Sequence, residues 1–433
     1  MRKTKTVKVV RNLAALAVVA GPLTAAMATN GYFSHGYGIK AKGMGGASVA
    51  MTDNAFAGAN NPAIAAWAGN RVELGLDFFM PNRSMERTGS TGGLNASVSS
   101  ESNLFFVPEF AYNRAVSDQL GVGIAVYGNG GMNTDYQGGP IPANRCGAGA
   151  PESNVLCGSG RLGVDLMQLI IAPTIAYKFN DIHSVGVSPL LVYQTFKAEG
   201  LQMFSSASMS KAPASVSGNG YDDSSGIGVR LGYLGKLNDK ISIGASYSPK
   251  IAMSKLSKYA GLFAGDGGLD IPENYTLGAS FLVTPAVTLA LDYSRINYSG
   301  VQSIANPSTN AALLGSPNGR GFGWTDVSVW KVGVQWQATP QLTMRAGVNV
   351  GDNPVQSRDV TFNIVAPGVI TTHYTVGGTY ALSSATDVTF SYMYAPSDLV
   401  SGTSLFNSFG MQAGTETVKM SQQALGVQFG WRF

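Results

Sequence analysis

The chain has 433 residues, of which 45% are hydrophobic, 10% aromatic and only 12% charged, and it contains 55 glycines and two cysteines. Its formal net charge of +4 arises at the N-terminus, because five of the 29 basic residues and none of the 25 acidic residues lie in the first 28 positions. The remainder carries 24 basic against 25 acidic residues, so overall charge gives no support for binding nucleic acid, and we predict no nucleic-acid partner.

The first 28 residues have the composition of a secretory signal peptide. A basic stretch is followed by the short apolar run LAALAVVAGPLTAA and by Ala26-Met27-Ala28, which fits a small-x-small cleavage site. A membrane anchor is the alternative, but the apolar run is too short to span a bilayer. We therefore predict a signal peptide over 1–28.

Residues 29–70 form the next predicted unit. They are rich in glycine and alanine, mildly apolar, and show no regular alternation. A disordered tail should be polar and charged, which this segment is not. We expect it to pack as a hatch (plug) inside the structure formed by 71–433.

Beyond residue 70, apolar residues alternate repeatedly with small or polar ones. In AVTLALDY (286–293), for example, Leu289 and Leu291 alternate with Ala290 and Asp292. Period-two alternation, low charge and the lack of a later apolar run long enough for a membrane helix favour a membrane β-barrel with a polar lumen. A secreted soluble β-sandwich is the alternative, and the low charge argues against it.

Turn signals and loops set the number of strands. Six short turns are predicted at 117–118, 180–181, 238–239, 284–285, 339–340 and 383–384, and seven longer loops near 81–101, 132–160, 198–219, 253–269, 300–323, 353–368 and 397–416. This asymmetry is typical of outer-membrane barrels. The predicted fold class is all-β: a fourteen-stranded antiparallel transmembrane barrel over 71–433, with the last strand, ALGVQFGWRF, closing against the first.

The two cysteines, Cys146 and Cys157, both fall in the second long loop. We predict a disulfide between them, as expected in an oxidising exterior. Metal ligation is the alternative, but no histidine lies nearby.

Several motifs, in order along the chain, resemble one known family. The run Gly43-Met44-Gly45-Gly46-Ala47, then Asp53 and Asn61-Pro62-Ala63, resembles the N-terminal hatch of FadL-type outer-membrane transporters. The segments FVPEFAY (106–112), GVGIAVYGNGGMNTDY (121–136), 271–293 and 373–396 resemble strands of the same family.

The resemblance implies a channel for long-chain fatty acids or aromatic hydrocarbons. Ligand would be caught among extracellular loops, pass a hatch that rearranges, and leave sideways through a gap made by a kink in the third strand. It also implies that barrel-assembly machinery recognises the terminal aromatic residue.

The resemblance places gating in the hatch and the lateral opening in the third strand. The candidates are Gly45, Gly46, Asp53, Asn61, Pro62 and Ala63 for gating, and Gly128, Gly130 and Gly131 for the kink. Asn-Pro also marks ordinary turns, and glycines also mark simple strand ends or bulges, so both structural readings stay open.

Alternation places Arg230, Lys331 and Arg345 toward the lumen, where they could anchor a ligand carboxylate. Pairing with lumen acids such as Glu109 and Asp292 is the alternative. A capture groove on the third and fourth long loops is the second candidate site, with mutual packing of the loops as its alternative. Its residues are Leu201, Met203, Phe204, Leu256, Tyr259, Leu262 and Phe263.

We therefore expect passive uptake of hydrophobic small molecules across the outer membrane of a Gram-negative cell, with long-chain fatty acids as the substrate. Aromatic hydrocarbons, a general polar porin and a surface adhesin are the alternatives. None of the three histidines lies in a recognisable catalytic motif, so we predict no enzyme, and we predict no cofactor or metal. The expected partners are the ligand, outer-membrane lipid, lipopolysaccharide and the assembly machinery, and the expected state is a monomer.

Overall fold

A computed structural model describes residues 30–433 of the chain. The predicted signal peptide lies outside these residues. Within them, no helix has the length and apolar character needed to cross a membrane.

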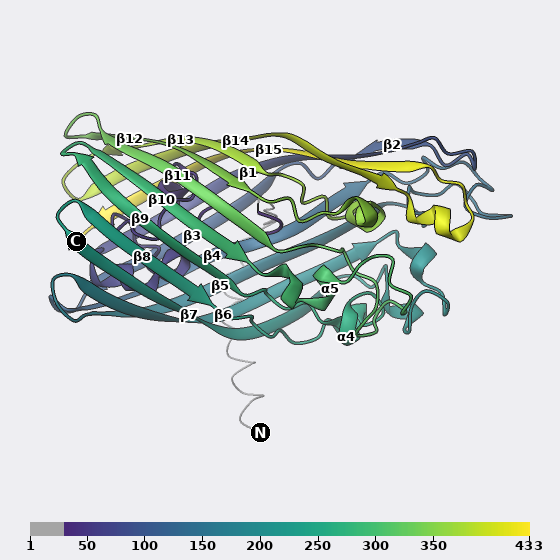
Figure 1. The fold of residues 1–433 in the computed structure, drawn as a ribbon, viewed down its shortest axis with the longest axis horizontal. Helices are drawn as coiled ribbons and strands as arrows, with labels where there is room; N and C mark the ends of the chain where they lie inside the picture. Colours follow the sequence, from purple (N-terminus) through teal and green to yellow (C-terminus); the bar gives the residue numbers. More distant parts are fainter. Residues whose placement is uncertain (1–29) are drawn as a thin grey trace, which may run out of the picture.

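Fourteen antiparallel strands form a closed barrel, in which each strand pairs with its neighbours in sequence and the last pairs with the first (Figure 1). Closure runs from Arg71, opposite Arg432, to Thr88, opposite Thr415. The predicted fourteen-stranded barrel is thereby confirmed. The strands are β1 (Arg71–Thr88), β3 (Phe105–Ala115), β4 (Leu120–Tyr136), β5 (Leu162–Lys178), β6 (His183–Glu199), β7 (Asp222–Asn238), β8 (Ile241–Ser248), β9 (Asn274–Thr284), β10 (Val287–Ile296), β11 (Val327–Gln337), β12 (Leu342–Gly351), β13 (Thr372–Ala381), β14 (Thr386–Thr403) and β15 (Thr415–Arg432).

Two faces of the wall differ as the alternation predicts. On β10, Leu291 is exposed and Asp292 is buried; on β15, Phe429 is exposed and Gln428 is buried. In a bilayer, the outward apolar side chains contact lipid and the inward polar ones line the lumen, and closure leaves no unpaired strand edge along the seam.

The short turns lie where the sequence predicts them. The first long loop begins later than expected, after Thr88, and the last long loop is shorter than expected, between Thr403 and Thr415. Pro81 and Asn82 look like turn residues, yet β1 continues to Thr88 because they pair with Gln422 and Ser421 of β15. A short extra strand, β2 (Ala96–Ser99), pairs only with the far end of β1. Pairing with the neighbouring long strand β15 therefore outweighs the preference of Pro81 and Asn82 for a turn.

The long loops all lie at one rim of the barrel, here called the long-loop end, and the short turns lie at the opposite rim, the short-turn end. Short helical turns occupy the long loops. They are η2 (Gln202–Phe204), η3 (Pro213–Ser215), η4 (Ser257–Tyr259), α4 (Ala264–Gly267), η5 (Tyr298–Gly300), α5 (Gln302–Ala305), η6 (Ser357–Asp359), α6 (Val360–Asn363) and η7 (Leu405–Phe409).

Residues 30–70, here called the N-terminal segment, lie within the ring of strands, near the end that carries the C-terminus (Figure 1). The segment contains α2 (Ile39–Lys42), α3 (Ala57–Asn60) and η1 (Pro62–Ala66). Helix α2 contacts β13, β14 and β15, whereas η1 contacts β5, β6 and β7. Only a segment inside the lumen can touch both of these parts of the wall.

Candidate functional site

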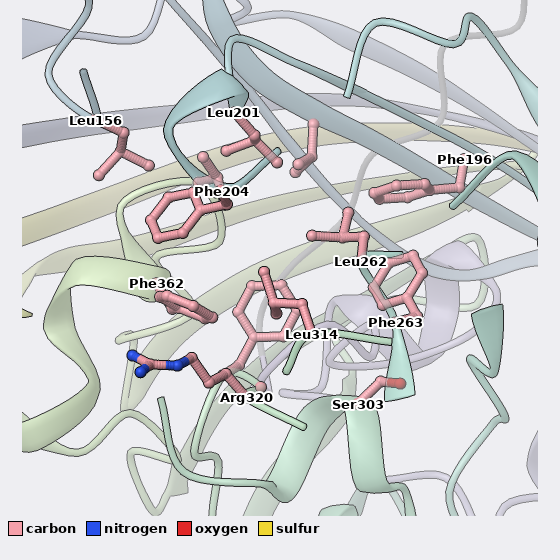
Figure 2. Close-up of a pocket in the computed structure, with 14 residues that line it drawn as sticks. Leu156, Phe196, Leu201, Phe204, Leu262, Phe263, Ser303, Leu314, Arg320 and Phe362 are labelled. Carbon is pink, nitrogen blue, oxygen red and sulfur yellow. The ribbon is translucent and has the colours of Figure 1, made fainter. Parts of the chain in front are cut away.

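An apolar pocket lies among the long loops (Figure 2). Its walls come from β5, β6 and five loops, so no single loop forms it. The lining residues are Leu156, Val164, Phe196, Leu201, Phe204, Leu262, Phe263, Ser303, Leu314, Arg320, Gly321, Phe322, Phe362 and Val365. Such a surface can bury the hydrocarbon part of a ligand, at about 0.8 kcal/mol per buried CH₂.

Four of the seven predicted groove residues line this pocket: Leu201, Phe204, Leu262 and Phe263. Met203, Leu256 and Tyr259 do not. Tyr259 packs edge-on against Phe196 with ring centroids 4.8 Å apart. Its hydroxyl accepts a bond from the Ala198 amide and donates to the Gly220 carbonyl. Tyr259 therefore supports the pocket wall from behind.

Sequence reasoning missed the other half of the pocket. Leu314 and Phe322 come from the fifth long loop, and Phe362 comes from α6 in the sixth. The available signal was the presence of large apolar residues within predicted loops, namely Leu313, Leu314, Phe322 and Trp324 in the fifth and Val360, Phe362, Ile364 and Val365 in the sixth. Phe196 faces the pocket from the end of a strand, where alternation alone could not separate it from an ordinary wall residue.

Arg320 is the one charged residue that lines the pocket, and Figure 2 shows its guanidinium beside the Phe362 ring at one end. Its Nη1 donates to the Ser308 carbonyl at 3.2 Å, and its guanidinium carbon lies 5.8 Å from the centroid of the Phe409 ring. Among the described residues it forms no ion pair with a carboxylate. Partial burial lowers the pKa of Arg320, because desolvation disfavours the charged form.

A second, more polar cavity lies in the lumen between the N-terminal segment and β7–β11. Arg230 and Lys331 both line it, together with Asp292, which stands directly opposite Lys331 across the β10–β11 pair. Arg230 donates through Nη1 to the Gly58 carbonyl at 3.1 Å and to the Tyr127 hydroxyl at 3.0 Å. Within residues 30–433, Lys331 is the one predicted anchor that lines this cavity without a hydrogen bond to the N-terminal segment.

Arg345, the third predicted anchor, binds an acid of the N-terminal segment and two residues of the neighbouring strands. Its Nη2 donates to Asp53 Oδ2 at 3.1 Å, and its Nε and Nη1 donate to Gln335 and Thr379. Asp53 was predicted as a gating residue and Arg345 as a ligand anchor, and the fold brings the two into contact. The Arg345 guanidinium thereby holds the N-terminal segment rather than a free lumen site.

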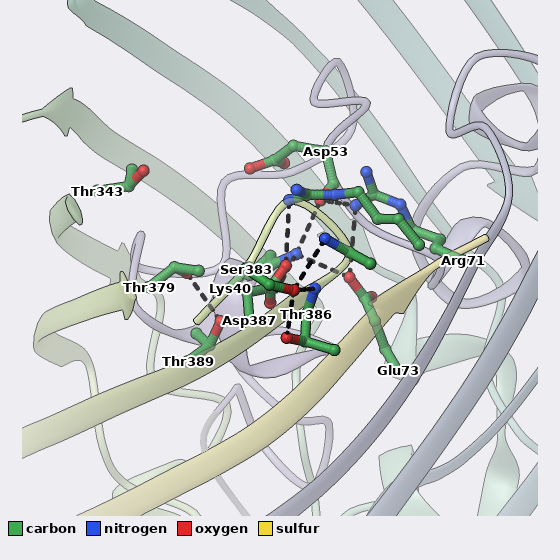
Figure 3. Close-up of polar contacts among 12 residues, drawn as sticks. Lys40, Asp53, Arg71, Glu73, Thr343, Thr379, Ser383, Thr386, Asp387 and Thr389 are labelled. Carbon is green, nitrogen blue, oxygen red and sulfur yellow. Dashed lines mark hydrogen bonds and ion pairs between the residues drawn. The ribbon is translucent and has the colours of Figure 1, made fainter. Parts of the chain in front are cut away.

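Buried ion pairs fasten the N-terminal segment to the barrel wall (Figure 3). Lys40 Nζ lies 2.8 Å from Glu73 Oε1. Outside the residues labelled in that figure, Lys42 Nζ lies 2.9 Å from Asp77 Oδ2. Lys42 also pairs with Glu109, one of the acids that the sequence offered as partners for the three predicted anchors. Removing one member of such a pair leaves an uncompensated charge in the lumen.

The other predicted gating residues are packed closely against the wall. Asn61 caps η1 by accepting a bond from the Ala63 amide, and its side-chain amide donates to the Val49 and Tyr233 carbonyls, both at 2.8 Å. Pro62 is the first residue of that helix. Gly45 and Gly46 have φ of +66° and +84°, a region that favours glycine, and a Cβ at Gly46 would fall 1.8 Å from the His35 carbonyl oxygen.

The predicted kink residues mark an interruption in the barrel wall. The β3–β4 ladder ends at Phe110 opposite Val126, and β4 then bulges between Gly128 and Gly130. Beyond that point β4 still pairs with β5, but its other edge bonds to the N-terminal segment: Ser34 N to Asn129 O at 3.2 Å, and Gly131 N to Tyr32 O at 3.1 Å. The gap between 102–109 and 127–134 is here called the lateral window.

The two cysteine sulfurs lie 2.02 Å apart, at bonding distance, within the loop that joins β4 and β5. This loop also contributes Leu156 to the apolar pocket. The pairing in the cell remains a prediction.

The fold and its sites define a class of protein: an outer-membrane β-barrel with an apolar loop pocket, a filled lumen and an interruption in the β3–β4 pairing of its wall. The family model for outer membrane protein transport protein (OMPP1/FadL/TodX) matches residues 16–433, so the chain belongs to this family. Members of the family are outer-membrane transport channels for hydrophobic compounds, not enzymes. No curated protein matches the chain.

Solved structures show the same fold. The Pseudomonas putida toluene transporter TodX is 20% identical, with a TM-score of 0.66 over 94% of this chain and 100% of that one. A Pseudomonas aeruginosa FadL homologue is 15% identical, with a TM-score of 0.66 over 93% of this chain and 100% of that one. The Ralstonia pickettii toluene transporter TbuX is 19% identical, with a TM-score of 0.64 over 92% and 99%.

Proposed function

We propose that this protein takes up long-chain fatty acids by passive diffusion. The loop pocket captures the ligand, the N-terminal segment gates the lumen, and the ligand leaves through the lateral window into the membrane. The observation that carries the proposal is an apolar pocket whose single charged lining residue, Arg320, has no carboxylate partner among residues 30–433.

A carboxylate with a long apolar chain satisfies both parts of this pocket. The chain buries apolar surface, and the carboxylate supplies the charge that the guanidinium lacks, through charge-assisted hydrogen bonds. A neutral ligand would desolvate Arg320 further without any compensating contact, which is unfavourable.

The backbone of β4 supports the proposed lateral exit. Unpaired backbone groups facing lipid cost several kcal/mol each, so a gap in a barrel wall needs other partners for them. Residues 32–34 supply those partners from inside. The same residues therefore close the window, and an outward passage requires the N-terminal segment to shift.

Aromatic hydrocarbons are the second candidate substrate, because five phenylalanines line the loop pocket. Aromatic rings gain about 0.5–1.5 kcal/mol per well-placed pair beyond their buried area. Their uptake would use the same window and N-terminal segment.

The test compares uptake of labelled oleate and labelled toluene by cells of a Gram-negative host that lacks channels of its own for either compound. We expect Arg320→Gln to lower oleate uptake about tenfold at limiting oleate, since a charge-assisted hydrogen bond is lost. Toluene uptake should stay within about twofold. Arg145→Gln, which removes an exposed loop arginine without an ion pair among the described residues, should change neither.

Wild-type protein that carries toluene but not oleate would favour the second candidate. Oleate uptake that is unchanged in Arg320→Gln would contradict the role of Arg320 in recognising the carboxylate. Surface expression and heat-resistant barrel mobility on gels should be equal for all variants.

A further inference from the structure

Arg83 lies at one edge of the lateral window. It is an inward-facing residue of β1, and its side chain reaches across to both sides of the gap. Nη1 donates to the Asn133 carbonyl on β4 at 2.6 Å. Nη2 donates to Ser100 Oγ at 3.3 Å and to the Ser102 carbonyl, which precedes β3. The guanidinium thus borders the opening at its long-loop side.

This cation is buried without a compensating anion. Arg83 is 4% exposed. No Asp or Glu side chain within residues 30–433 lies within 4.0 Å of it, whereas Arg87 on the same strand pairs with Glu416. Glu101 and Asp135 lie within two residues of groups that Arg83 contacts, but both pair with Arg161 instead.

Arg83 has an unused donor and lies beside a small cavity. Its Nε–H has no hydrogen-bond partner although it is buried. The residue lines a cavity whose other walls are largely apolar, with Phe79, Met132, Trp324 and Met420 among them. A buried, uncompensated guanidinium with a free donor beside an apolar cavity is electrostatically suited to an anionic headgroup with a hydrocarbon tail.

We propose that Arg83 binds the carboxylate of the ligand at the lateral window, as the last protein contact before the ligand enters the bilayer. This inference rests on the proposed function and adds a headgroup site at the exit. Leu104 and Phe106, 49% and 41% exposed beside the window, offer the tail an apolar surface toward lipid. The headgroup stays paired while the tail leaves, so no bare carboxylate has to cross the wall.

The experiment measures uptake of labelled oleate and of oleyl alcohol, which has the same chain and no charge, by cells carrying the full-length protein. Arg83→Gln should lower oleate uptake about tenfold and leave oleyl alcohol within about twofold. Arg83→Lys keeps the charge and should retain more oleate uptake than Arg83→Gln. The matched control is Arg161→Gln, which removes an exposed charge next to the window and should change neither rate.

An equal loss of both compounds in Arg83→Gln, with Arg83→Lys no better, would overturn the proposal, because it would assign Arg83 a purely structural role at the window. Unchanged oleate uptake in Arg83→Gln would also overturn it. Wild-type protein that carries neither compound would overturn the proposed function itself.

A lipid phosphate could offer the same anionic chemistry as a fatty acid. Calorimetric titration of purified protein in non-ionic detergent separates the two, with oleate in one arm and dioleoyl phosphatidate in the other. The proposal expects Arg83→Gln to weaken oleate binding. Loss of phosphatidate binding with oleate binding intact would assign the site to membrane lipid and overturn the proposal.

Discussion

At the scale of single residues, the buried charged side chains divide into those that form an ion pair with a carboxylate and those that do not. Lys40, Lys42 and Arg345 each join the N-terminal segment to the wall through a carboxylate. Arg83 and Arg320 form no ion pair among the described residues. Paired charges hold the segment in place, and unpaired cations mark where an anionic ligand would gain most.

Lys42→Met tests the first of these roles. The variant leaves Asp77 and Glu109 facing each other in the lumen without their cation, and breaking a buried pair costs about 3–5 kcal/mol. We expect a clearly lower midpoint of thermal unfolding in detergent micelles.

Arg161→Gln is the comparison for Lys42→Met, because it breaks two exposed ion pairs, each of which contributes about 0–1 kcal/mol. Equal shifts in the two variants would show that the lumen pairs do not stabilise the protein more than surface pairs do.

At the scale of elements, β4 has two different edges. Toward β5 it is paired along its length apart from one bulge, and toward β3 it is paired only up to Val126. Gly130 permits the alternative pairing with the N-terminal segment, because a Cβ there would lie 1.7 Å from the Tyr32 carbonyl oxygen. The window is therefore a property of one strand and of the segment behind it.

Gly130→Ala should displace residues 32–34 and destabilise the protein by about 1–3 kcal/mol, the usual cost of overpacking. Gly378→Ala is the control, because a Cβ there meets only ordinary contacts, the nearest at 3.5 Å. Unfolding midpoints of both variants in micelles check this expectation. A Gly130→Ala midpoint equal to that of the wild type would mean that the segment is not seated against β4.

The second long loop provides a separate prediction. If Cys146 and Cys157 are bonded, unfolded protein should show no reactive thiol before reductant and two after it, by labelling and mass spectrometry. The barrel itself should stay folded in reductant, because the bond closes only a short loop. Two reactive thiols before reduction would contradict the pairing.

At the scale of the whole molecule, a barrel of fourteen strands would enclose a water-filled pore if its lumen were empty. Here residues 30–70 occupy it, and nearly all of them are buried. On the proposed route, a filled lumen suits a hydrophobic solute better than a hydrated channel, because the solute would pass from an apolar pocket to lipid without entering water.

Planar-bilayer recordings test this arrangement. We expect only small or brief ionic currents, compared with those of an unrelated fourteen-stranded porin without a lumen segment. A stable, wide conductance would instead support the polar-porin alternative.

Much of the fold was determined by local sequence pattern. Period-two alternation gives the strands and their faces, short turn signals at positions such as Asn238-Asp239 and Thr284-Pro285 give the hairpins, and the apolar C-terminal row gives the closing strand. These features could be predicted because each depends on residues close together in the chain. The start of the first long loop was predicted too early for the same reason. Pro81 remains in a strand because it pairs with Gln422 of β15, which is distant in the sequence.

The candidate sites depended on contacts between distant parts of the chain, and only the tertiary structure decided them. The sequence indicated that Arg230, Lys331 and Arg345 face the lumen. It did not indicate that Arg345 forms an ion pair with Asp53, or Lys42 with Glu109. Likewise, nothing local to Arg83 shows that it lacks a carboxylate. Which buried charge is paired is set by the closure of the barrel around residues 30–70, because that closure brings together side chains 67 residues apart in one of these pairs and 292 in the other.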